Sequence, residues 1–269
     1  MLPHLNILKE QWENRKLIIS LSMYNLKSSY AGHYLGLFWI IIMPAMQVAL
    51  YYIVFGLGLR GDRGDVAGLP FIVHLISGIF PWTFISAGVN SAAGAIQSQI
   101  GLVTKMKFPS STLITINITV GLRGLLVTTA IVLLISIING YSNPLSYLVF
   151  FYFVIASSAL IFSLGLIMST LTIIVRDLKN VFQNVMRMCF FITPIFWSLD
   201  EADPLLQNIA SFNPFAYLVM TYRTAFVLET GPFYGDMFDH IYFWTFTLFL
   251  FYIGVHIHYR FRKTIVDYL

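Results

Sequence analysis

Residues 145–174 read LSYLVFFYFVIASSALIFSLGLIMSTLTII and contain no Asp, Glu, Lys or Arg. A helix needs about 20 predominantly apolar residues to cross a bilayer, so this stretch is long enough to span a membrane. The whole chain has 269 residues, of which 58% are hydrophobic and 10% are charged, against about 45–50% and 25% in soluble domains. These proportions exclude a soluble globular enzyme and a disordered chain, and they indicate a polytopic membrane protein.

Five further apolar runs lie on either side of this stretch. Pro44, Pro81 and Pro194 fall inside three of the runs, where a proline removes a backbone N–H and bends or breaks a helix. The predicted fold class is all-α, with a six-helix transmembrane domain over residues 31–269. The six candidate transmembrane helices are 35–59, 70–97, 112–138, 145–174, 181–198 and 241–259.

The first 30 residues have a different pattern from the rest. Leu5, Leu8, Trp12 and Ile19 recur at helical spacing among polar side chains. This pattern predicts an amphipathic helix over residues 1–30 that lies on the membrane surface, with Trp12 as its interfacial anchor.

The stretch 199–240, between the fifth and sixth candidate helices, is too polar to span the membrane and too apolar for a plain loop. Asn213 followed by Pro214 is a helix-start signal, because Asn caps a helix N-terminus and Pro suits the first helical position. We therefore predict short re-entrant helices in this stretch.

Basic residues gather on one predicted side of the membrane, whereas most acidic residues fall on the other. The positive-inside rule then places both termini in the cytoplasm. It also accounts for the formal net charge of +4 without a nucleic-acid partner. The clustered bases are Lys9, Arg15, Lys16, Lys27, Lys105, Lys107, Arg176, Lys179, Arg260, Arg262 and Lys263.

Several chemistries have no motif in this sequence. No Gly-x4-Gly-Lys-Ser/Thr loop is present, so the chain is not expected to hydrolyse ATP by the usual route. His256 and His258 are two residues apart and face different sides of a helix, so we predict no metal site and no cofactor in this chain. None of the six apolar runs holds an Asp or Glu, which argues against a proton-coupled secondary transporter.

Arg123 is the exceptional charge, because it lies some ten residues into the third apolar run. An unpaired cation there costs a few kcal/mol. Arg123 either meets an anionic group of a substrate, or it faces water or a polar interhelical contact between Gly121 and Gly124, and the sequence leaves both interpretations open. Arg187 lies nearer the cytoplasmic end of the fifth run and is predicted to extend its charged end toward the interface.

Aromatic residues make up 16% of the chain. Their faces can stack on sugar rings, and tyrosine hydroxyls can hydrogen-bond to sugar hydroxyls, so they suit a path that binds a glycan weakly. The alternative is the interfacial belt of Trp and Tyr that membrane proteins commonly carry.

Seven short motifs follow one another in a recognisable order. In that order they resemble the permease subunits of type-2 ATP-binding-cassette exporters, which move lipid-linked polysaccharides and teichoic acids. Within this family the chain is most similar to the permeases that export wall teichoic acid. The motifs are KSSY at 27–30, LGLFW at 35–39, GIFPW at 78–82, KMKFP at 105–109, RDLK at 176–179, TPIFW at 193–197 and NPF at 213–215.

The resemblance implies a bacterial plasma-membrane complex of two permease copies and two copies of a separate ATPase subunit, which would bind ATP and Mg²⁺. The substrate would be a polymer on undecaprenyl diphosphate, carried to the outer leaflet through a conduit lined by the first and fifth helices of each copy. The N-terminal helix with Trp12 would guard the cytoplasmic opening, where Lys27, Tyr30 and His33 could engage the diphosphate. By position, the predicted substrate path comprises Tyr30, Trp39, Tyr51, Tyr52, Phe190, Phe191 and Trp197. Arg123 is a further candidate because of its charge and is not implied by the resemblance.

A permease without an ATPase must receive motion from its partner, and the polar segment 98–110 is the predicted contact. Its apolar side chains would anchor in a groove of the ATPase while its two lysines meet acidic groups. Alternatives to the teichoic acid exporter are an exporter of O-antigen or capsular polysaccharide, a membrane-bound transferase acting on lipid-linked sugars, and a channel or passive scramblase. The predicted coupling residues are Leu102, Val103, Lys105, Met106, Lys107 and Phe108.

Overall fold

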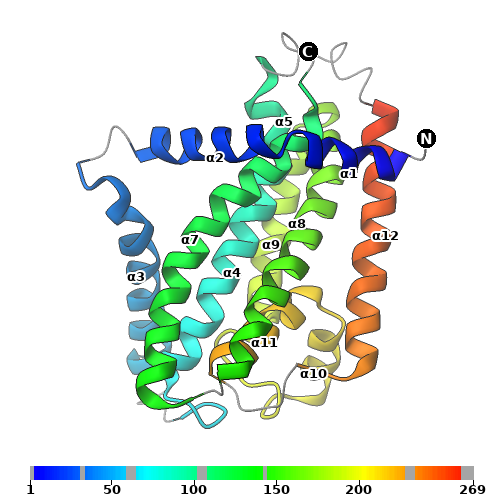
Figure 1. The fold of residues 1–269 in the computed structure, drawn as a ribbon. Coiled ribbons are helices and arrows are strands. Elements are labelled where there is room, and N and C mark those ends of the chain that lie inside the picture. Colours follow the sequence, from blue (N-terminus) through cyan, green and yellow to red (C-terminus); the bar gives the residue numbers. More distant parts are fainter. Residues whose placement is uncertain are drawn as a thin grey trace.

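The computed structural model describes residues 3–30, 34–58, 65–101, 108–141, 144–227 and 234–261, and within these ranges the regular structure is helical apart from one isolated bridge between Val66 and Leu69. The predicted all-α class is therefore confirmed (Figure 1). The α-helices are α1 (Pro3–Glu13), α2 (Arg15–Tyr30), α3 (Trp39–Tyr51), α4 (Phe71–Ala93), α5 (Ala95–Ser98), α7 (Ser110–Asn139), α8 (Leu148–Ile174), α9 (Leu178–Ile192), α10 (Pro204–Ser211), α11 (Pro214–Phe226) and α12 (Met237–Phe261).

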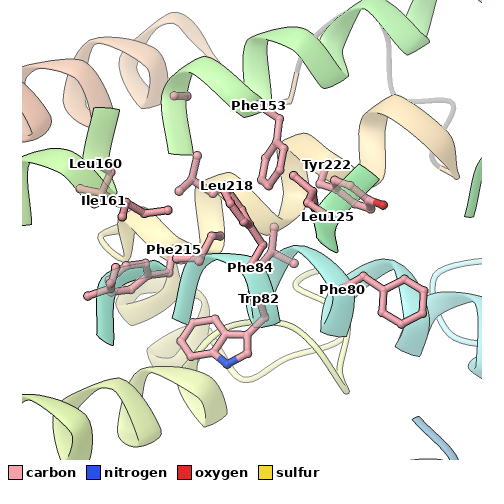
Figure 2. Close-up of a cluster of buried hydrophobic side chains, with 14 of the residues drawn as sticks. Phe80, Trp82, Phe84, Leu125, Phe153, Leu160, Ile161, Phe215, Leu218 and Tyr222 are labelled. Atoms are coloured by element: carbon pink, nitrogen blue, oxygen red, sulfur yellow. The ribbon is translucent and has the colours of Figure 1, made fainter. Parts of the chain in front are cut away.

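Helix α4 is the centre of a bundle of long helices. It packs against α7, α8 and α11, and α8 packs in turn against α12. In its most apolar window 78% of the residues are buried, because apolar side chains surround the whole helix rather than one stripe. Figure 2 shows how α4, α8 and α11 meet: Trp82 and Phe84 lie beside Phe153, Phe215 and Leu218.

Pro81 does not break α4, which stays helical from Phe71 to Ala93. Of the predicted bend or break, a break is therefore not found at Pro81. A proline inside a helix costs one backbone hydrogen bond, and the dense packing around α4 keeps the helix intact. Pro44 likewise lies inside α3.

Helix α3 stands at the edge of the bundle (Figure 1). It continues directly into a π-helical segment, Tyr52–Gly58, and in the window Trp39–Leu57 only 11% of the residues are buried. Its outer face carries large apolar side chains such as Met43, Met46 and Leu50. This face is therefore available to lipid or to another protein chain.

The first two helices cross one end of the bundle (Figure 1). The predicted apolar face is exposed, with Trp12 at 71%, as expected for a face turned toward a membrane surface. The helices also have a second apolar face, which was not predicted from the sequence. Ile7 and Ile18 are buried, and they lie about a third of a turn from Trp12, where α1 and α2 contact α7.

Five helical segments are long and apolar enough to cross a membrane among the residues that the structure describes, one fewer than predicted. The missing one is the run 181–198, where α9 has 15 residues and ends at Ile192. Fifteen residues extend about 22 Å, less than the hydrocarbon thickness of about 30 Å. The cause is Pro194, which disfavours helical geometry at the preceding residue; Thr193 is extended, with ψ of 135°.

Helix α9 follows α8 after a short turn and packs beside it (Figure 1). The start of α1 and the end of α12 lie at the same end of the bundle, and His4 contacts Tyr252 with ring centroids 5.9 Å apart.

Two short helices, α10 and α11, occupy the far end of the bundle (Figure 1). Asp203 caps α10 through the Leu205 N–H, and Asn213 caps α11 through the Phe215 N–H. The helix-start signal at Asn213 is therefore confirmed. Helix α11 is almost entirely buried from Phe215 to Phe226.

The contact between α8 and α12 depends on Gly254. A Cβ at this position would lie 2.9 Å from Leu166 Cβ and 3.1 Å from the Ser163 carbonyl oxygen. We expect Gly254→Ala to lower stability by about 1–3 kcal/mol, the usual cost of overpacking. The unfolding temperature in detergent, followed by tryptophan fluorescence, measures this effect. The matched control is Gly124→Ala on α7, where a Cβ meets nothing within 4 Å; equal unfolding temperatures for the two variants would contradict the prediction.

Candidate functional site

A cleft with a volume of about 560 Å³ lies between α3, α4 and α9. Helix α3 contributes two side chains, α4 three and α9 five. The cleft combines aromatic rings with amide groups and one cation, which is a composition suited to a hydroxyl-rich or anionic ligand. Its lining residues are Gln47, Tyr51, Trp82, Ser86, Asn90, Gln183, Met186, Arg187, Phe190 and Phe191.

The aromatic part of the cleft is centred on Phe190. Its ring centroid lies 5.6 Å from that of Tyr51 and 5.6 Å from that of Trp82. Phe191, the next residue, is 62% exposed. The ring centroid of Phe196 lies 5.1 Å from that of Phe190. Three helices thus contribute to one continuous aromatic surface. Of the aromatic side chains that line the cleft, only Phe191 is largely exposed.

The polar part of the cleft lies toward the end of the bundle that carries α1 and α2. Helices α4 and α9 are antiparallel here: Lys179 approaches Gly94 and, further along, Phe190 meets Trp82. This register places Gln183 and Arg187 opposite the α4 segment that carries Asn90 and Ser86. Asn90 Nδ2 donates to Ser86 Oγ at 3.4 Å.

Part of this cleft was predicted from the sequence. Tyr51, Phe190 and Phe191 were predicted substrate-path residues, and the structure brings them together. Trp82 and the polar side chains were not among the predicted path residues. The sequence does contain a signal for the polar side chains of α9. Lys179, Gln183 and Arg187 follow one another at intervals of four residues, which places them on one face of a helix that continues to Phe190.

Three other predicted path residues do not line the cleft. Tyr52 stacks on Phe71, with centroids 6.4 Å apart. Trp197 follows the end of α9 and donates its indole N–H to the Phe191 carbonyl at 3.3 Å. Trp39 lines a different, mainly apolar cavity of about 650 Å³ between α2, α3, α4 and α7.

Arg123 makes the polar interhelical contact that was one of its two interpretations. Its two terminal nitrogens donate to the carbonyl and hydroxyl oxygens of Ser22 at 2.8 and 2.9 Å, so its partner is the N-terminal helix α2. Nearer the start of α7, Gln11 donates to Ser111 at 2.9 Å and accepts from Thr115 at 2.7 Å. These contacts attach α1 and α2 to α7.

The remaining predicted residues lie outside the cleft or outside the described residues. Trp12 and Lys27 are exposed on α1 and α2, and Tyr30 ends α2. Phe108 is partly buried and packs against the core of the bundle. His33 and the predicted coupling residues Leu102, Val103, Lys105, Met106 and Lys107 fall outside the described residues.

At the other end of the bundle, Arg223 on α11 is buried without an ion pair among the described residues. Its guanidinium instead donates to the backbone carbonyls of His74 (2.9 Å), Ile195 (3.0 Å) and Pro194, and to Ser77 Oγ (3.3 Å) and Met220 Sδ (3.6 Å). These five contacts use the five N–H donors that an arginine has. Arg223 therefore fixes the non-helical segment after α9 and has no donor left for a ligand.

Arg223 and Tyr234 line a cavity of about 450 Å³ at this end of the bundle. Burial, and next the negative charges of Asp239 and Asp200, raise the pKa of the Tyr234 phenol to about 12. Its hydroxyl is therefore neutral at physiological pH and can donate a hydrogen bond.

Comparison with known proteins gives a consistent assignment. Residues 16–227 match the ABC-2 type transporter family. The O-antigen export system permease protein RfbA of Myxococcus xanthus is 26% identical over 85% of this chain and 86% of its own length. The protein of that name from Klebsiella pneumoniae is 26% identical over 80% and 81%. The inner membrane transport permease YadH of Escherichia coli K12 is 26% identical over 70% and 75%.

Proposed function

From the premise that this chain belongs to the ABC-2 type transporter family, we propose that it is the permease of an ATP-driven exporter of a lipid-linked polysaccharide. The observation that carries this proposal is the cleft in which Tyr51, Trp82 and Phe191 lie beside the amides of Gln47, Asn90 and Gln183. Aromatic faces stack on sugar rings and amides hydrogen-bond to hydroxyl groups. Such contacts are individually weak, which suits a polymer that must slide past them.

O-antigen is the polymer class that the relatives favour. Two of the proteins reported above are O-antigen export permeases, and nothing among them points to teichoic acid. Teichoic acid, which the sequence motifs favoured, is therefore not the substrate that we propose. We propose the alternative, O-antigen or capsular polysaccharide. A transferase is disfavoured because the cleft lining has no carboxylate.

The proposed complex has two copies of this chain and two ATPase subunits. The cleft lies at the edge of the protomer, between α9 and the sparsely packed α3, so a second copy placed against these helices would convert two open clefts into one conduit. The chain contains no phosphate loop, and ATP with Mg²⁺ would be bound by the partner. We keep the segment around Met106 as the proposed ATPase contact.

The proposed location is the bacterial inner membrane, with the α1–α2 end of the bundle on the cytoplasmic side. Lys9, Lys16 and Lys27 are exposed at this end, in agreement with the positive-inside rule. The exposed face of α1 that carries Trp12 would then lie in the headgroup region, next to the cytoplasmic opening of the conduit.

A complementation experiment tests the function. The chain is co-expressed with the ATPase subunit of its own host in a strain that makes O-antigen but lacks its exporter, and surface polymer is detected by antibody on intact cells. We expect surface O-antigen, and none when the phosphate-loop lysine of the ATPase is replaced. An assembled complex that leaves the polymer inside the cell, in this strain and in matched teichoic acid and capsule strains, would refute the proposal.

A further inference from the structure

Arg187 projects into the cleft with most of its hydrogen-bonding capacity unused. Of its five N–H donors, one has an acceptor among the described residues, Asn184 Oδ1, at 3.3 Å from Nη1. Arg223 provides the contrast, because protein acceptors occupy its whole guanidinium. Arg187 is exposed and keeps four donors for a ligand.

No negative charge of the described chain balances Arg187 within the cleft, whose lining has no Asp or Glu. The nearest acid along the chain, Asp177, is exposed just before α9 begins, and ten residues of helix separate it from Arg187 by about 15 Å. An unpaired cation is costly within a membrane and commonly marks a functional site. An anionic ligand would supply the missing charge.

The side chains around Arg187 are suited to a phosphate group. Gln183 lies one helical turn before it, and Asn90 lies on the facing helix α4. Asn90 Nδ2 uses one of its two N–H donors on Ser86 Oγ and keeps the other for a ligand, whereas its Oδ1, which is buried without a hydrogen-bond partner among the described residues, can accept from a hydroxyl of the same ligand. Arginine binds phosphate through two parallel N–H···O bonds, and the two amides can add donors from either side.

The aromatic surface next to these groups selects an amphiphile rather than a free ion. Tyr51, Trp82 and Phe190 follow Arg187 toward the middle of the bundle. A volume of about 560 Å³ falls within the range of about 300–1,000 Å³ typical of ligand pockets. A phosphate therefore fits beside Arg187 while an uncharged part of the same molecule contacts the rings.

We propose that Arg187, with Asn90 and Gln183, binds the phosphate-bearing headgroup of a lipid in this cleft. The inference rests on the proposed function in one respect: the lipid would be the carrier of the exported polymer. It assigns the headgroup to the interior of the cleft, whereas the sequence analysis placed it at Lys27 and His33. Lys27 does not line the cleft.

The test measures binding of radiolabelled farnesyl diphosphate to the purified permease–ATPase complex in nanodiscs without nucleotide. We expect the Kd to rise at least tenfold in Arg187→Gln and to be intermediate in Arg187→Lys, which keeps the charge but not the planar fork. Arg260→Gln is the matched control, because it removes an exposed arginine from the end of α12; its Kd should equal that of the parent. Farnesol should displace the probe at least tenfold less well than unlabelled farnesyl diphosphate.

Three results would overturn the inference. The first is that Arg187→Gln binds the probe with the same Kd as the parent, whether or not Lys27→Gln raises the Kd. Farnesol could compete as well as farnesyl diphosphate, which would exclude phosphate recognition. Inorganic pyrophosphate could compete equally well, which would indicate a site for free anions. The assay contains neither ATP nor polymer, so its failure is distinct from failure of the complementation experiment. Unchanged ATPase copurification shows that Arg187→Gln is folded.

Discussion

Arg223→Gln should prevent the permease from folding stably. The substitution removes the donors to the carbonyl oxygens of His74, Pro194 and Ile195, which are buried in the junction of α4, α11 and the segment after α9. Each unsatisfied buried acceptor costs about 1–3 kcal/mol, so we expect a loss of at least about 3 kcal/mol. A loss of this size is a large fraction of the stability of a typical domain.

The unfolding temperature in detergent and the amount of protein in the membrane measure this loss. Arg223→Lys should be intermediate, because an ammonium keeps the charge but cannot reach acceptors on three elements at once. Arg187→Gln is the matched control, since the same replacement at an exposed position leaves no buried acceptor without a donor. If Arg223→Gln and Arg187→Gln unfolded at the same temperature, the anchoring role of Arg223 would be refuted.

Phe191→Ala should reduce polysaccharide export at least about fivefold without affecting assembly. Phe191 is 62% exposed in the cleft, so its truncation opens no cavity in the core. An aromatic contact contributes about 0.5–1.5 kcal/mol, and the proposed homodimer would lose one in each copy. Since 1.4 kcal/mol corresponds to a factor of ten, a decrease of this size is expected when the substrate is not saturating.

The measurement is the rate at which surface polymer appears on cells that express equal amounts of complex. Phe249→Ala is the matched control, because Phe249 is 60% exposed on α12 and does not line the cleft. Phe191→Tyr should retain export, because it keeps the ring. Equal export by Phe191→Ala and Phe249→Ala would remove Phe191 from the substrate path, whereas loss of the ATPase from Phe191→Ala would assign it to assembly.

The sequence predicted the helical class and most of the elements, because each depends on local composition. A run such as 145–174 leaves the chain no alternative to a helix in a bilayer, since unpaired backbone groups in hydrocarbon are too costly. Asn213 capped α11 as predicted, because capping involves neighbouring residues only. The fifth span was predicted too long because the apolar sequence continues past Thr193. The helix does not continue, because Pro194 disfavours helical geometry at Thr193.

The candidate site was predicted only in its aromatic part. Tyr51, Phe190 and Phe191 came from the family resemblance, and the structure places them together. Tyr52 points toward Phe71 instead, because successive residues of a helix lie about 100° apart and only one of two adjacent tyrosines can face the same cleft. Trp82 was not predicted, because apolar residues surround α4 and its pattern does not indicate which face meets α9.

Three arginines in apolar surroundings show what the sequence by itself determined and what only the tertiary structure decided. The sequence places Arg123 and Arg187 within predicted transmembrane runs and Arg223 in the stretch 199–240, but it does not show which groups they contact. Ser22 lies 101 residues from Arg123, and His74 lies 149 residues from Arg223. Hydrogen bonds act over about 3 Å, so only the fold brings these acceptors into place; it saturates Arg223, attaches Arg123 to the N-terminal helix and leaves Arg187 with free donors in the cleft.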